Sequence, residues 1–205
     1  MFGDGLKNDE DIQMMRNNKE ILMKSINKSI LAILGASEEL RNDEDVQKIR
    51  NNKEKVLKDI KEDYLALAMA SYELRNNKEF LLEALEINPF CIKAIDDELK
   101  NDKEFLMQAA EKNIYVLSYA SDELLNDKEF IKQAIEKESH AHINLKNYSI
   151  LKYVSDELKN DEELMLYAVE NGSVYFLYVS DKLKNDEDFM LKAIEKQKIY
   201  RYGLC

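Results

Sequence analysis

Residues 115–137 read "YVLSYASDELLNDKEFIKQAIEK", in which two apolar patterns of helical period flank one polar junction. The pattern after the junction has the spacing of one face of an α-helix: Phe130, Ile131, Ala134 and Ile135. The pattern before it has apolar residues seven and four positions ahead of its last leucine: Leu117, Ala120 and Leu124. The stretch therefore predicts one α-helix on each side of the junction, the first of them about ten residues long.

The junction recurs along the chain, and its asparagine marks the period. The copies are Asn8, Asn17, Asn42, Asn51, Asn76, Asn101, Asn126, Asn160 and Asn185. Successive copies are 25 residues apart, except for two steps of 9 residues and one of 34. Self-similarity at a short period is typical of stacked repeats, because units this small cannot bury their apolar faces alone. The sequence therefore predicts an all-α fold, an α-solenoid-like superhelical array of 25-residue helix-turn-helix repeats.

These repeats subdivide a single helical-repeat domain that spans residues 1–205. Units are expected to begin near residues 17, 51, 76, 101, 126 and 160, and a partial unit is expected at 185–205. Because Asn160 follows Asn126 by 34 residues instead of 25, the spacing also predicts an insertion, placed at residues 138–146.

The two steps of 9 residues put one junction directly after another, as in "LRNDEDVQKIRNN" at 40–52. The apolar residues around this phrase fall within about a third of the helical circle: Val46, Ile49, Val56, Leu57 and Ile60. We therefore expect an extended first helix near 42–61 and another near 8–28, each with its second asparagine inside the helix.

The junction also predicts how the following helix begins. In "NDKEF" at 101–105, Asn101 can accept a hydrogen bond from the amide of the third helical residue, while Glu104 reaches back to the amide of Asn101. The same capping box is expected at three further junctions, in the pairs Asn76 and Glu79, Asn126 and Glu129, and Asn160 and Glu163.

The composition favours helix and argues against several classes of partner. The chain has 45% hydrophobic and 35% charged residues but only one proline and five glycines, too few for the turns of a β-rich fold. Its net charge of −11 argues against binding to nucleic acid and to a membrane surface. No apolar run has the length of a membrane-spanning helix, and the first residues lack a signal-peptide pattern. A cytoplasmic location is therefore expected.

The stretch quoted first has two close echoes, "ILKYVSDELKNDEELMLYAVENG" at 150–172 and "FLYVSDKLKNDEDFMLKAIEK" at 176–196. Through its Ser-Asp-Glu-Leu-x-Asn-Asp core, the chain resembles the tandem helical repeats of domain-of-unknown-function family 4116 over most of residues 51–196. The resemblance implies units of about fifty residues, each spanning two of the 25-residue units. It also implies a helical repeat module with no assigned activity and no catalytic residues to transfer.

Residue types that carry chemistry are sparse. His140 and His142 lie in the expected insertion with Glu138 nearby, but no spacing marks the further ligands that a metal needs. Cys91 lies in an apolar helical pattern and is interpreted as a buried hydrophobe, whereas Cys205 could oxidise between chains. No nucleophile elbow or phosphate-binding glycine loop is present. We therefore expect neither an enzyme nor a cofactor.

Two rows of side chains recur in a manner that could form a binding surface. The first row is acidic and precedes the leucine that ends the second helix: Asp97, Glu98, Asp122, Glu123, Asp156, Glu157 and Asp181. Carboxylates near a helix C-terminus are unfavourable, so this row indicates either compensation by the next helix N-terminus or a ridge for a basic partner. The second row lies five residues before the same leucine, at the core margin: Tyr119, Tyr153 and Tyr178. Small size for close packing is the expected role of the serines that follow: Ser121, Ser155 and Ser180.

Three functions are compatible with these features. The first is a non-catalytic module or scaffold that binds another protein, because stacked repeats form extended surfaces. The second is a self-assembling structural protein, since "KQKIYRYGLC" at 196–205 replaces the last second helix and leaves an incompletely capped apolar end. The third is a metal-dependent activity at His140 and His142.

Overall fold

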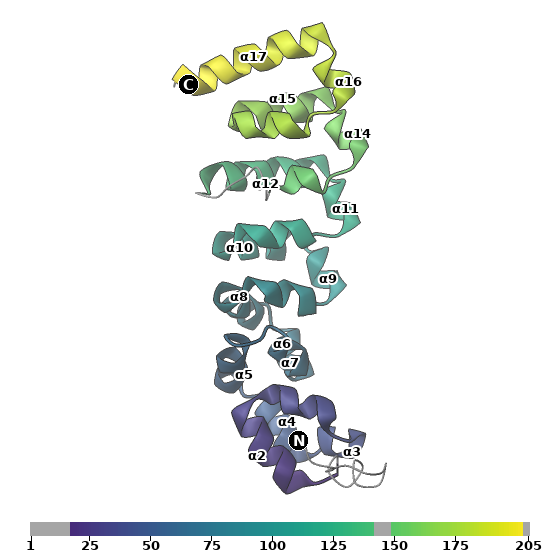
Figure 1. Ribbon diagram of the computed structural model, residues 1–205, viewed down its shortest axis with the longest axis vertical. Coiled ribbons are helices and arrows are strands. Elements are labelled where there is room, and N and C mark those ends of the chain that lie inside the picture. Colours follow the sequence, from purple (N-terminus) through teal and green to yellow (C-terminus); the bar gives the residue numbers. More distant parts are fainter. Residues whose placement is uncertain (1–16, 142–148, 203–205) are drawn as a thin grey trace, which may run out of the picture. The chain divides into compact units, whose positions relative to one another are not determined.

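The computed structural model describes residues 17–141 and 149–202. Within these ranges the chain forms α-helices and short 3-10 helices without any strand, which confirms the all-α class. The chain divides into two compact units, unit 1 up to Ile95 and unit 2 from Asp96. Figure 1 labels the α-helices of both units. None of the described helices is both long enough and apolar enough to cross a membrane.

In the described part of unit 1, shorter elements lie between the α-helices of seven to ten residues, except between α4 and α5. In chain order they are α2 Lys19–Lys28, η1 Ile30–Gly35, α3 Glu38–Arg41, α4 Glu44–Arg50, α5 Lys53–Ile60, α6 Ala66–Met69, α7 Tyr72–Arg75, α8 Lys78–Ile87 and η2 Pro89–Ala94, where η denotes a 3-10 helix. η1 packs on α2 and α6, and α5 packs on α6 and α8. Each short element therefore covers a longer helix before or after it.

Unit 2 repeats this arrangement more regularly. Its elements are α9 Asp97–Lys100, α10 Lys103–Lys112, η3 Ile114–Tyr119, α11 Asp122–Leu125, α12 Lys128–His140, η4 Ile150–Lys152, α14 Asp156–Lys159, α15 Glu162–Asn171, η5 Ser173–Tyr178, α16 Asp181–Lys184 and α17 Glu187–Tyr202. α10, α12, α15 and α17 pack on one another in chain order. Figure 1 shows α9, α11, α14 and α16 following one another along one side of this stack.

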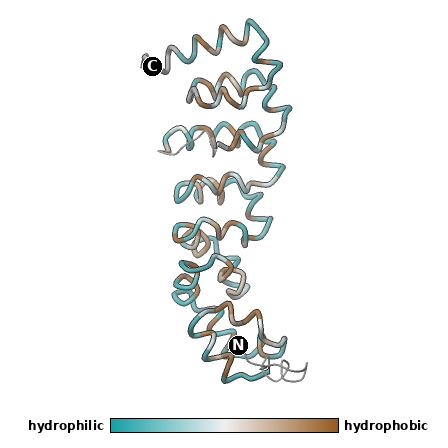
Figure 2. The backbone as a smooth tube through the Cα atoms, in the orientation of Figure 1, coloured by the Kyte–Doolittle hydropathy of each residue, from teal (hydrophilic) through white to brown (hydrophobic). Residues whose placement is uncertain are grey.

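The longer helices bury the apolar face that the sequence predicts. In α12, the side chains of Phe130, Ile131, Ala134 and Ile135 are fully buried. Leu124, which ends the preceding pattern, is 7% exposed. Figure 2 shows hydrophobic and hydrophilic residues interleaved along these helices, as the 3.6-residue period requires.

The helix caps differ from the prediction by one residue. The side chain of Asp102, rather than Asn101, accepts the hydrogen bond from the amide of Phe105, at 2.9 Å. Asn77, Asp127 and Asp161 cap their helices in the same way. The asparagines predicted as caps end the short helices instead: Asn76, Asn101, Asn126 and Asn160. The predicted capping box is therefore wrong, because Glu104 stands at the second helical position and not the third.

The predicted second helix is broken into two elements. In unit 2, η3 ends at Tyr119, and α11 begins after Ser121, whose backbone is extended. The Ser121 hydroxyl accepts a hydrogen bond from the amide of Leu124, at 3.2 Å. A serine side chain that bonds the backbone three residues on favours a helix start over a helix interior. A 3-10 helix followed by a four-residue α-helix therefore replaces the single helix expected there.

The doubled junction at 42–52 breaks the helix, so the extended helix predicted near 42–61 is wrong. α4 ends at Arg50, and Asn52 starts α5 by accepting a hydrogen bond from the amide of Lys55, at 3.0 Å. The extended helix predicted near 8–28 lies partly outside the described residues. Inside them, Asn18 caps α2, which begins at Lys19.

The predicted insertion at 138–146 begins as helix. α12 has 13 residues, whereas α8, α10 and α15 have 10 each, so Glu138, Ser139 and His140 lengthen it. Residues 142–148, which include His142, lie outside the described residues.

Within each unit, ion pairs link most of the helices that follow a junction to the next such helix. In unit 1 the pairs are Lys19 with Asp43 (2.7 Å) and Lys53 with Glu83 (2.6 Å). In unit 2 they are Glu111 with Lys137 (3.0 Å), Lys128 with Asp161 (2.8 Å), Glu162 with Lys192 (2.7 Å) and Glu170 with Lys196. Consecutive helices therefore contact each other through ion pairs on their polar faces as well as through their apolar faces.

Candidate functional site

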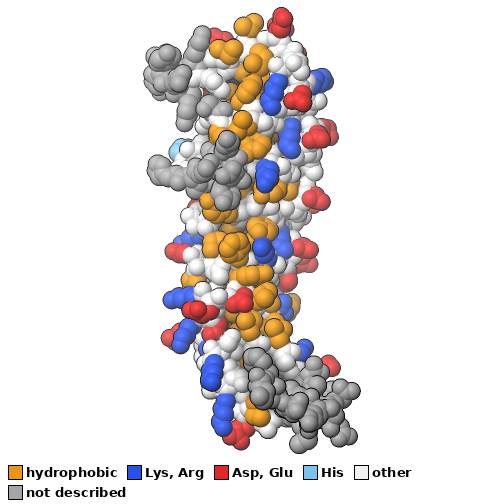
Figure 3. All heavy atoms as spheres, viewed as in Figure 1, with side chains coloured by type: hydrophobic (Ala, Val, Ile, Leu, Met, Phe, Trp, Pro, Cys, Tyr) orange, Lys and Arg blue, Asp and Glu red, His pale blue; other side chains and the backbone are white. Residues whose placement is uncertain are grey.

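The acidic row of the sequence lies on the four short helices of unit 2, and we call it the acidic edge: Asp97, Glu98, Asp122, Glu123, Asp156, Glu157 and Asp181. All seven residues are exposed. The prediction that they approach a helix C-terminus is wrong, because they occupy the first turns of α9, α11, α14 and α16. Carboxylates are favourable there, so each also helps its own short helix to form. Figure 3 shows acidic side chains along this side of unit 2.

The negative charge of the acidic edge is greatest at α11. In α9 and α14 a lysine faces the aspartate of the same helix, at 3.0 Å for Lys100 and Asp97 and at 3.9 Å for Lys159 and Asp156. α11 carries Leu125 at the position of these lysines, and α16 carries two lysines. A positively charged ligand would therefore meet the most favourable potential at the middle of the edge.

A hydrogen-bonded clasp joins α9 to α11. The Ser121 hydroxyl donates to the side-chain oxygen of Asn101, whose amide nitrogen donates to the Glu123 carboxylate at 2.9 Å. The backbone amide of Ser121 donates to the carbonyl of Lys100, at 3.0 Å. The clasp thus fixes the position of one acidic side chain relative to the preceding short helix.

The clasp occurs at alternate junctions. Asn51 accepts from the Ser71 hydroxyl at 2.7 Å, and Asn160 accepts from the Ser180 hydroxyl. The intervening asparagines turn back and donate to a carbonyl of their own short helix: Asn76 to Tyr72, Asn126 to Asp122 and Asn185 to Asp181. The structural period therefore spans two 25-residue units, which agrees with the fifty-residue unit that the family resemblance implied.

The serines that start the short helices of unit 2 have a role that the sequence analysis did not predict. Small size is an insufficient account of them, because Ser121, Ser155 and Ser180 each accept a hydrogen bond from the amide three residues on. The signal was present, since serine followed by acidic residues is typical of a helix N-terminus.

The tyrosine row lies where the 3-10 helices of unit 2 end. Tyr119 and Tyr178 are the half-buried last residues of η3 and η5, and Tyr153 follows η4 and is 42% exposed. The Lys152 ammonium lies 5.5 Å from the centre of the Tyr153 ring. Burial, with smaller effects of Glu138 and Tyr153, raises the pKa of the Tyr178 phenol. Tyr178 is therefore a neutral hydrogen-bonding group near neutral pH.

Sequence reasoning also missed a buried carboxylate, that of Glu138, which is 1% exposed. It accepts hydrogen bonds from the Ser149 hydroxyl (3.0 Å), the Ile150 amide (2.6 Å) and the Tyr175 hydroxyl (3.4 Å). Burial raises the pKa of Glu138 to about 7, although these neutral donors act in the opposite direction. Glu138 therefore joins α12 to the start of η4 and to η5.

A similar contact in unit 1 shows which sequence pattern accompanies a buried carboxylate of this kind. The amide of Ile30 donates to the Asp59 carboxylate at 2.7 Å, and the Lys55 ammonium lies 2.5 Å from the same carboxylate. Ser-Ile-Leu occurs at 29–31 and again at 149–151. In both places this triplet starts a 3-10 helix whose first amide binds a buried carboxylate from a longer helix.

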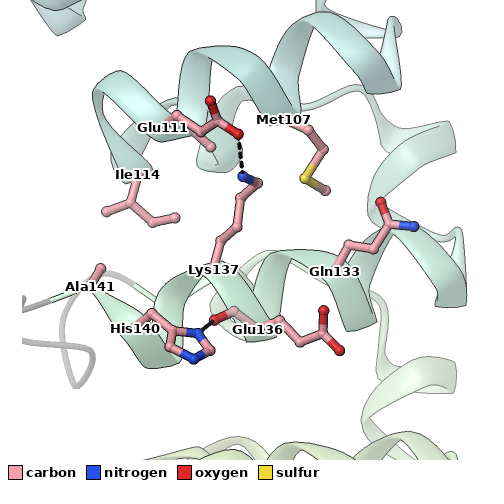
Figure 4. A pocket seen from close by; sticks show the side chains of 9 residues that line it. Met107, Glu111, Ile114, Gln133, Glu136, Lys137, His140 and Ala141 are labelled. Carbon is pink, nitrogen blue, oxygen red and sulfur yellow. Dashed lines mark hydrogen bonds and ion pairs between the residues drawn. The ribbon is translucent and has the colours of Figure 1, made fainter.

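An open pocket of about 550 Å³ lies between α10 and α12 (Figure 4). Met107 and Ile114 line it on the α10 side, and Lys137 reaches across to Glu111 at 3.0 Å. His140 stands at its end, and its Nδ1–H donates to the carbonyl of Glu136 at 2.7 Å. This hydrogen bond leaves Nε2 as the one ring nitrogen able to accept a proton or bind a metal.

For the metal site considered at His140 and His142, the described residues provide one potential ligand and no complete set of ligands. His140 lies in the pocket, whereas His142 lies outside the described residues. Among residues 17–141 and 149–202, no three His, Cys, Asp or Glu side chains are placed to hold a metal ion together. Cys91 is buried, as predicted, and burial raises the pKa of its thiol to about 12. Cys205 lies outside the described residues.

Comparison with known families gave matches to one model, described as "Domain of unknown function (DUF4116)". The matched segments are residues 52–100, 79–124, 102–141, 143–177 and 171–202. Several of these segments overlap, whereas the third and fourth are separated by residue 142, inside the insertion. Comparison with curated proteins and with solved structures gave no match. Since the matches extend over residues 52–202 of a 205-residue chain, this protein belongs to the DUF4116 family of tandem helical repeats.

Proposed function

We propose that this chain is a non-catalytic module that binds another protein through the acidic edge and the tyrosine row of unit 2. One observation carries the proposal: seven exposed carboxylates occupy equivalent positions on four consecutive short helices. A row of this kind presents negative charge over several turns of the stack, which a basic peptide or a basic protein surface can match.

The tyrosines complement the carboxylates as contact groups. Tyr119, Tyr153 and Tyr178 each lie two residues before the serine that starts a short helix, so they flank the acidic edge. Tyrosine provides apolar contact area together with a hydroxyl, and it is enriched at protein interfaces. Tyr153, with 42% of its surface exposed, is the member of the row most available to a partner.

A binding role suits the side chains of the edge better than catalysis does. The hydroxyls of Ser121 and Ser180 are already committed to Asn101 and Asn160. The remaining groups are carboxylates and phenols, which bind cations and pack against apolar groups. We infer a cytoplasmic site of action from the acidic composition and from the buried free thiol of Cys91.

The test is affinity capture with two matched variants. The first reverses three charges of the acidic edge: Asp97→Lys, Asp122→Lys and Asp156→Lys. The second reverses three exposed first-turn carboxylates of the longer helices: Glu104→Lys, Glu129→Lys and Asp188→Lys. Both variants change the net charge equally and remove carboxylates from helix N-termini, so they differ mainly in which surface they alter.

The partner captured by the wild-type chain is then titrated directly by calorimetry at low and high salt. We expect the edge variant to lose affinity at least about tenfold, and the matched variant to bind as the wild type does. Binding should weaken at high salt, because exposed charges are screened over about 10 Å at 0.1 M ionic strength. Equal loss in both variants, or no loss in the edge variant, would refute the proposed surface.

A further inference from the structure

Six ion pairs between consecutive long helices follow one numbering rule, and three further pairs, made by Asp45 and Glu163, end instead at the third position of the following helix. Counted from the junction asparagine, a helix offers its second and tenth positions to the helix that follows, which receives them at its first, seventh or eleventh position. The contact between α15 and α17 illustrates the rule, with Glu162 on Lys192 at 2.7 Å and Glu170 on Lys196. A helix therefore has an offering side and a receiving side, which carry opposite charges in each pair.

The offering side of α17 repeats that of α15. Glu187 and Glu195 stand at the second and tenth positions after Asn185, where α15 has Glu162 and Glu170. Between them, Leu191 is 68% exposed and Ile194 is 47% exposed. The residue equivalent to Ile194 is at most 7% exposed in α8, α10, α12 and α15. Within the described residues, no helix covers this side of α17.

The receiving side of α2 repeats that of α17. Lys24 and Lys28 stand at the seventh and eleventh positions after Asn17, where α17 has Lys192 and Lys196. Both lysines are exposed, and Ile21 beside them is 45% exposed. The residue equivalent to Ile21 is at most 1% exposed in α4, α8, α10, α12, α15 and α17, whereas α5 carries the part-buried Lys55 there. The described chain thus has an uncovered receiving side as well as an uncovered offering side.

We propose that α17 of one copy packs against α2 of a second copy, with Glu187 facing Lys24 and Glu195 facing Lys28. Ile194 and Leu191 of the first copy cover Ile21 of the second. Two features select a second copy as the occupant: the charges match pair for pair, and the contact continues the packing already seen between α15 and α17. Lys24 exchanges its exposed contact with Glu20 of its own helix for one with Glu187.

This contact is heterologous, since it joins different surfaces of the two copies, and it therefore generates open chains or closed rings. It uses neither the acidic edge nor the tyrosine row, so either proposal can fail without the other. Nothing in it depends on how the two units of one chain are placed.

The test uses two charge-reversed variants of the whole chain, studied by light scattering after size-exclusion chromatography over a wide concentration range. The tail variant is Glu187→Lys with Glu195→Lys, and the head variant is Lys24→Glu with Lys28→Glu. We expect the measured mass of the wild-type protein to rise with concentration, from that of one chain toward multiples of it. Each variant alone should associate at least tenfold more weakly, and an equimolar mixture should regain association because each reversed side then finds its complement.

Two controls accompany the mixture. Glu104→Lys with Glu129→Lys changes the net charge as the tail variant does, lies outside both proposed surfaces, and should associate as the wild type does. Leu191→Ala with Ile194→Ala keeps the charges and should weaken association through lost apolar contact, and circular dichroism checks that each variant is helical. A wild-type chain that stays monomeric would overturn the proposal, as would a mixture that fails to associate. An effect of the tail variant alone would indicate a contact of α17 with α17 or with another protein, and would overturn it too.

Discussion

Glu138 is a residue at which burial and hydrogen bonding oppose each other. The Ser149, Ile150 and Tyr175 donors favour the ionised carboxylate, whereas its nearly complete burial favours the protonated form, and burial has the larger effect. Asp59 makes the matching contact in unit 1 but also has the Lys55 ammonium beside it. The two sites are therefore similar in their hydrogen bond to a 3-10 helix but differ in that, within the described residues, only Asp59 has a lysine ammonium beside it.

A stability change with pH follows from Glu138. Its pKa is about 7 in the folded chain and near 4.5 in a solvated glutamate, so its contribution to stability is fully present below about pH 4.5 and is lost as pH rises through 7. The loss should be on the order of 2 to 3 kcal/mol between the two limits. Urea unfolding at pH 5 and pH 8 should show this dependence flattened in Glu138→Gln. The exposed Glu129→Gln serves as control, and a wild-type slope retained in Glu138→Gln would contradict the assignment.

The helix caps show a limit of sequence reasoning at single positions. Asn101 and Asp102 are both good capping residues, so composition alone does not choose between them. The structure chooses the second, because the first ends the preceding short helix and bonds to the next one. The repeat period located the junction correctly. Which of its two residues caps the next helix depended on a break in the second helix that was not predicted.

Replacing Asp102 by alanine should destabilise the protein by about 1 kcal/mol, through loss of the hydrogen bond from the Phe105 amide. Asp102→Asn should retain most of the stability, because an asparagine side chain also accepts that bond, as Asn77 does in α8. Chemical denaturation of the two variants measures the difference. Equal stability of Asp102→Ala and the wild type would show that this cap is dispensable.

At the scale of elements, the period of apolar residues identified the longer helices but could not show that the second helix is broken. Leu117, Ala120 and Leu124 keep the spacing of one helix face, although Ala120 has an extended backbone between η3 and α11. Apolar spacing reports which residues are buried, and different local conformations bury the same residues. The serine before the acidic pair was the sequence feature that favoured a break.

The clasp predicts a coupling between elements that alternates along the chain. Asn101→Ala and Ser121→Ala should be non-additive, with an interaction energy of about 0.5 to 1 kcal/mol, because the two side chains share a hydrogen bond. Asn126→Ala and Ser155→Ala, the equivalent pair at the next junction, should be additive, since the Asn126 side chain bonds within its own short helix. Double-mutant cycles from urea unfolding test both pairs. Equal coupling in the two pairs would contradict the alternation.

Leu124 links the short helix α11 to the core. Leu124→Ala should cost about 2 to 5 kcal/mol, because the side chain is 7% exposed and its removal leaves a cavity. The adjacent exposed Glu123→Ala should cost less, through loss of one contact with Asn101. Thermal unfolding of both variants gives the comparison, and similar small losses would show that α11 packs loosely.

For the whole molecule, the repeat explains why the fold class was predictable and the function less so. An apolar period of this kind has one main solution, a stack of helices in which each covers its neighbour. The acidic edge and the tyrosine row were found as rows because they share that period. Glu138 belongs to no row, since it lies in the insertion, and periodicity therefore gave no sign of it.

Stability should also vary along the stack of unit 2. Amides of α17 should exchange with solvent faster than those of α15, because α15 is covered by α12 and α17 whereas Leu191 and Ile194 are exposed. Hydrogen exchange followed by mass spectrometry measures both helices in one experiment. Uniform protection at a low protein concentration would contradict this gradient.

The alternating clasp has a consequence for how such a chain can change in length. The additional nine residues between Asn126 and Asn160 fall in an interval whose first asparagine is turned back on its own helix. Extra residues there interrupt no hydrogen bond of the clasp type among the described residues. We therefore expect loops and labels to be tolerated where the longer helix ends in the intervals that begin at Asn76 and Asn126, the second of which holds the insertion at 138–146. Grafting them after Asn51, Asn101 or Asn160 should disrupt the joint between neighbouring modules, and deletions should succeed in steps of two hairpins.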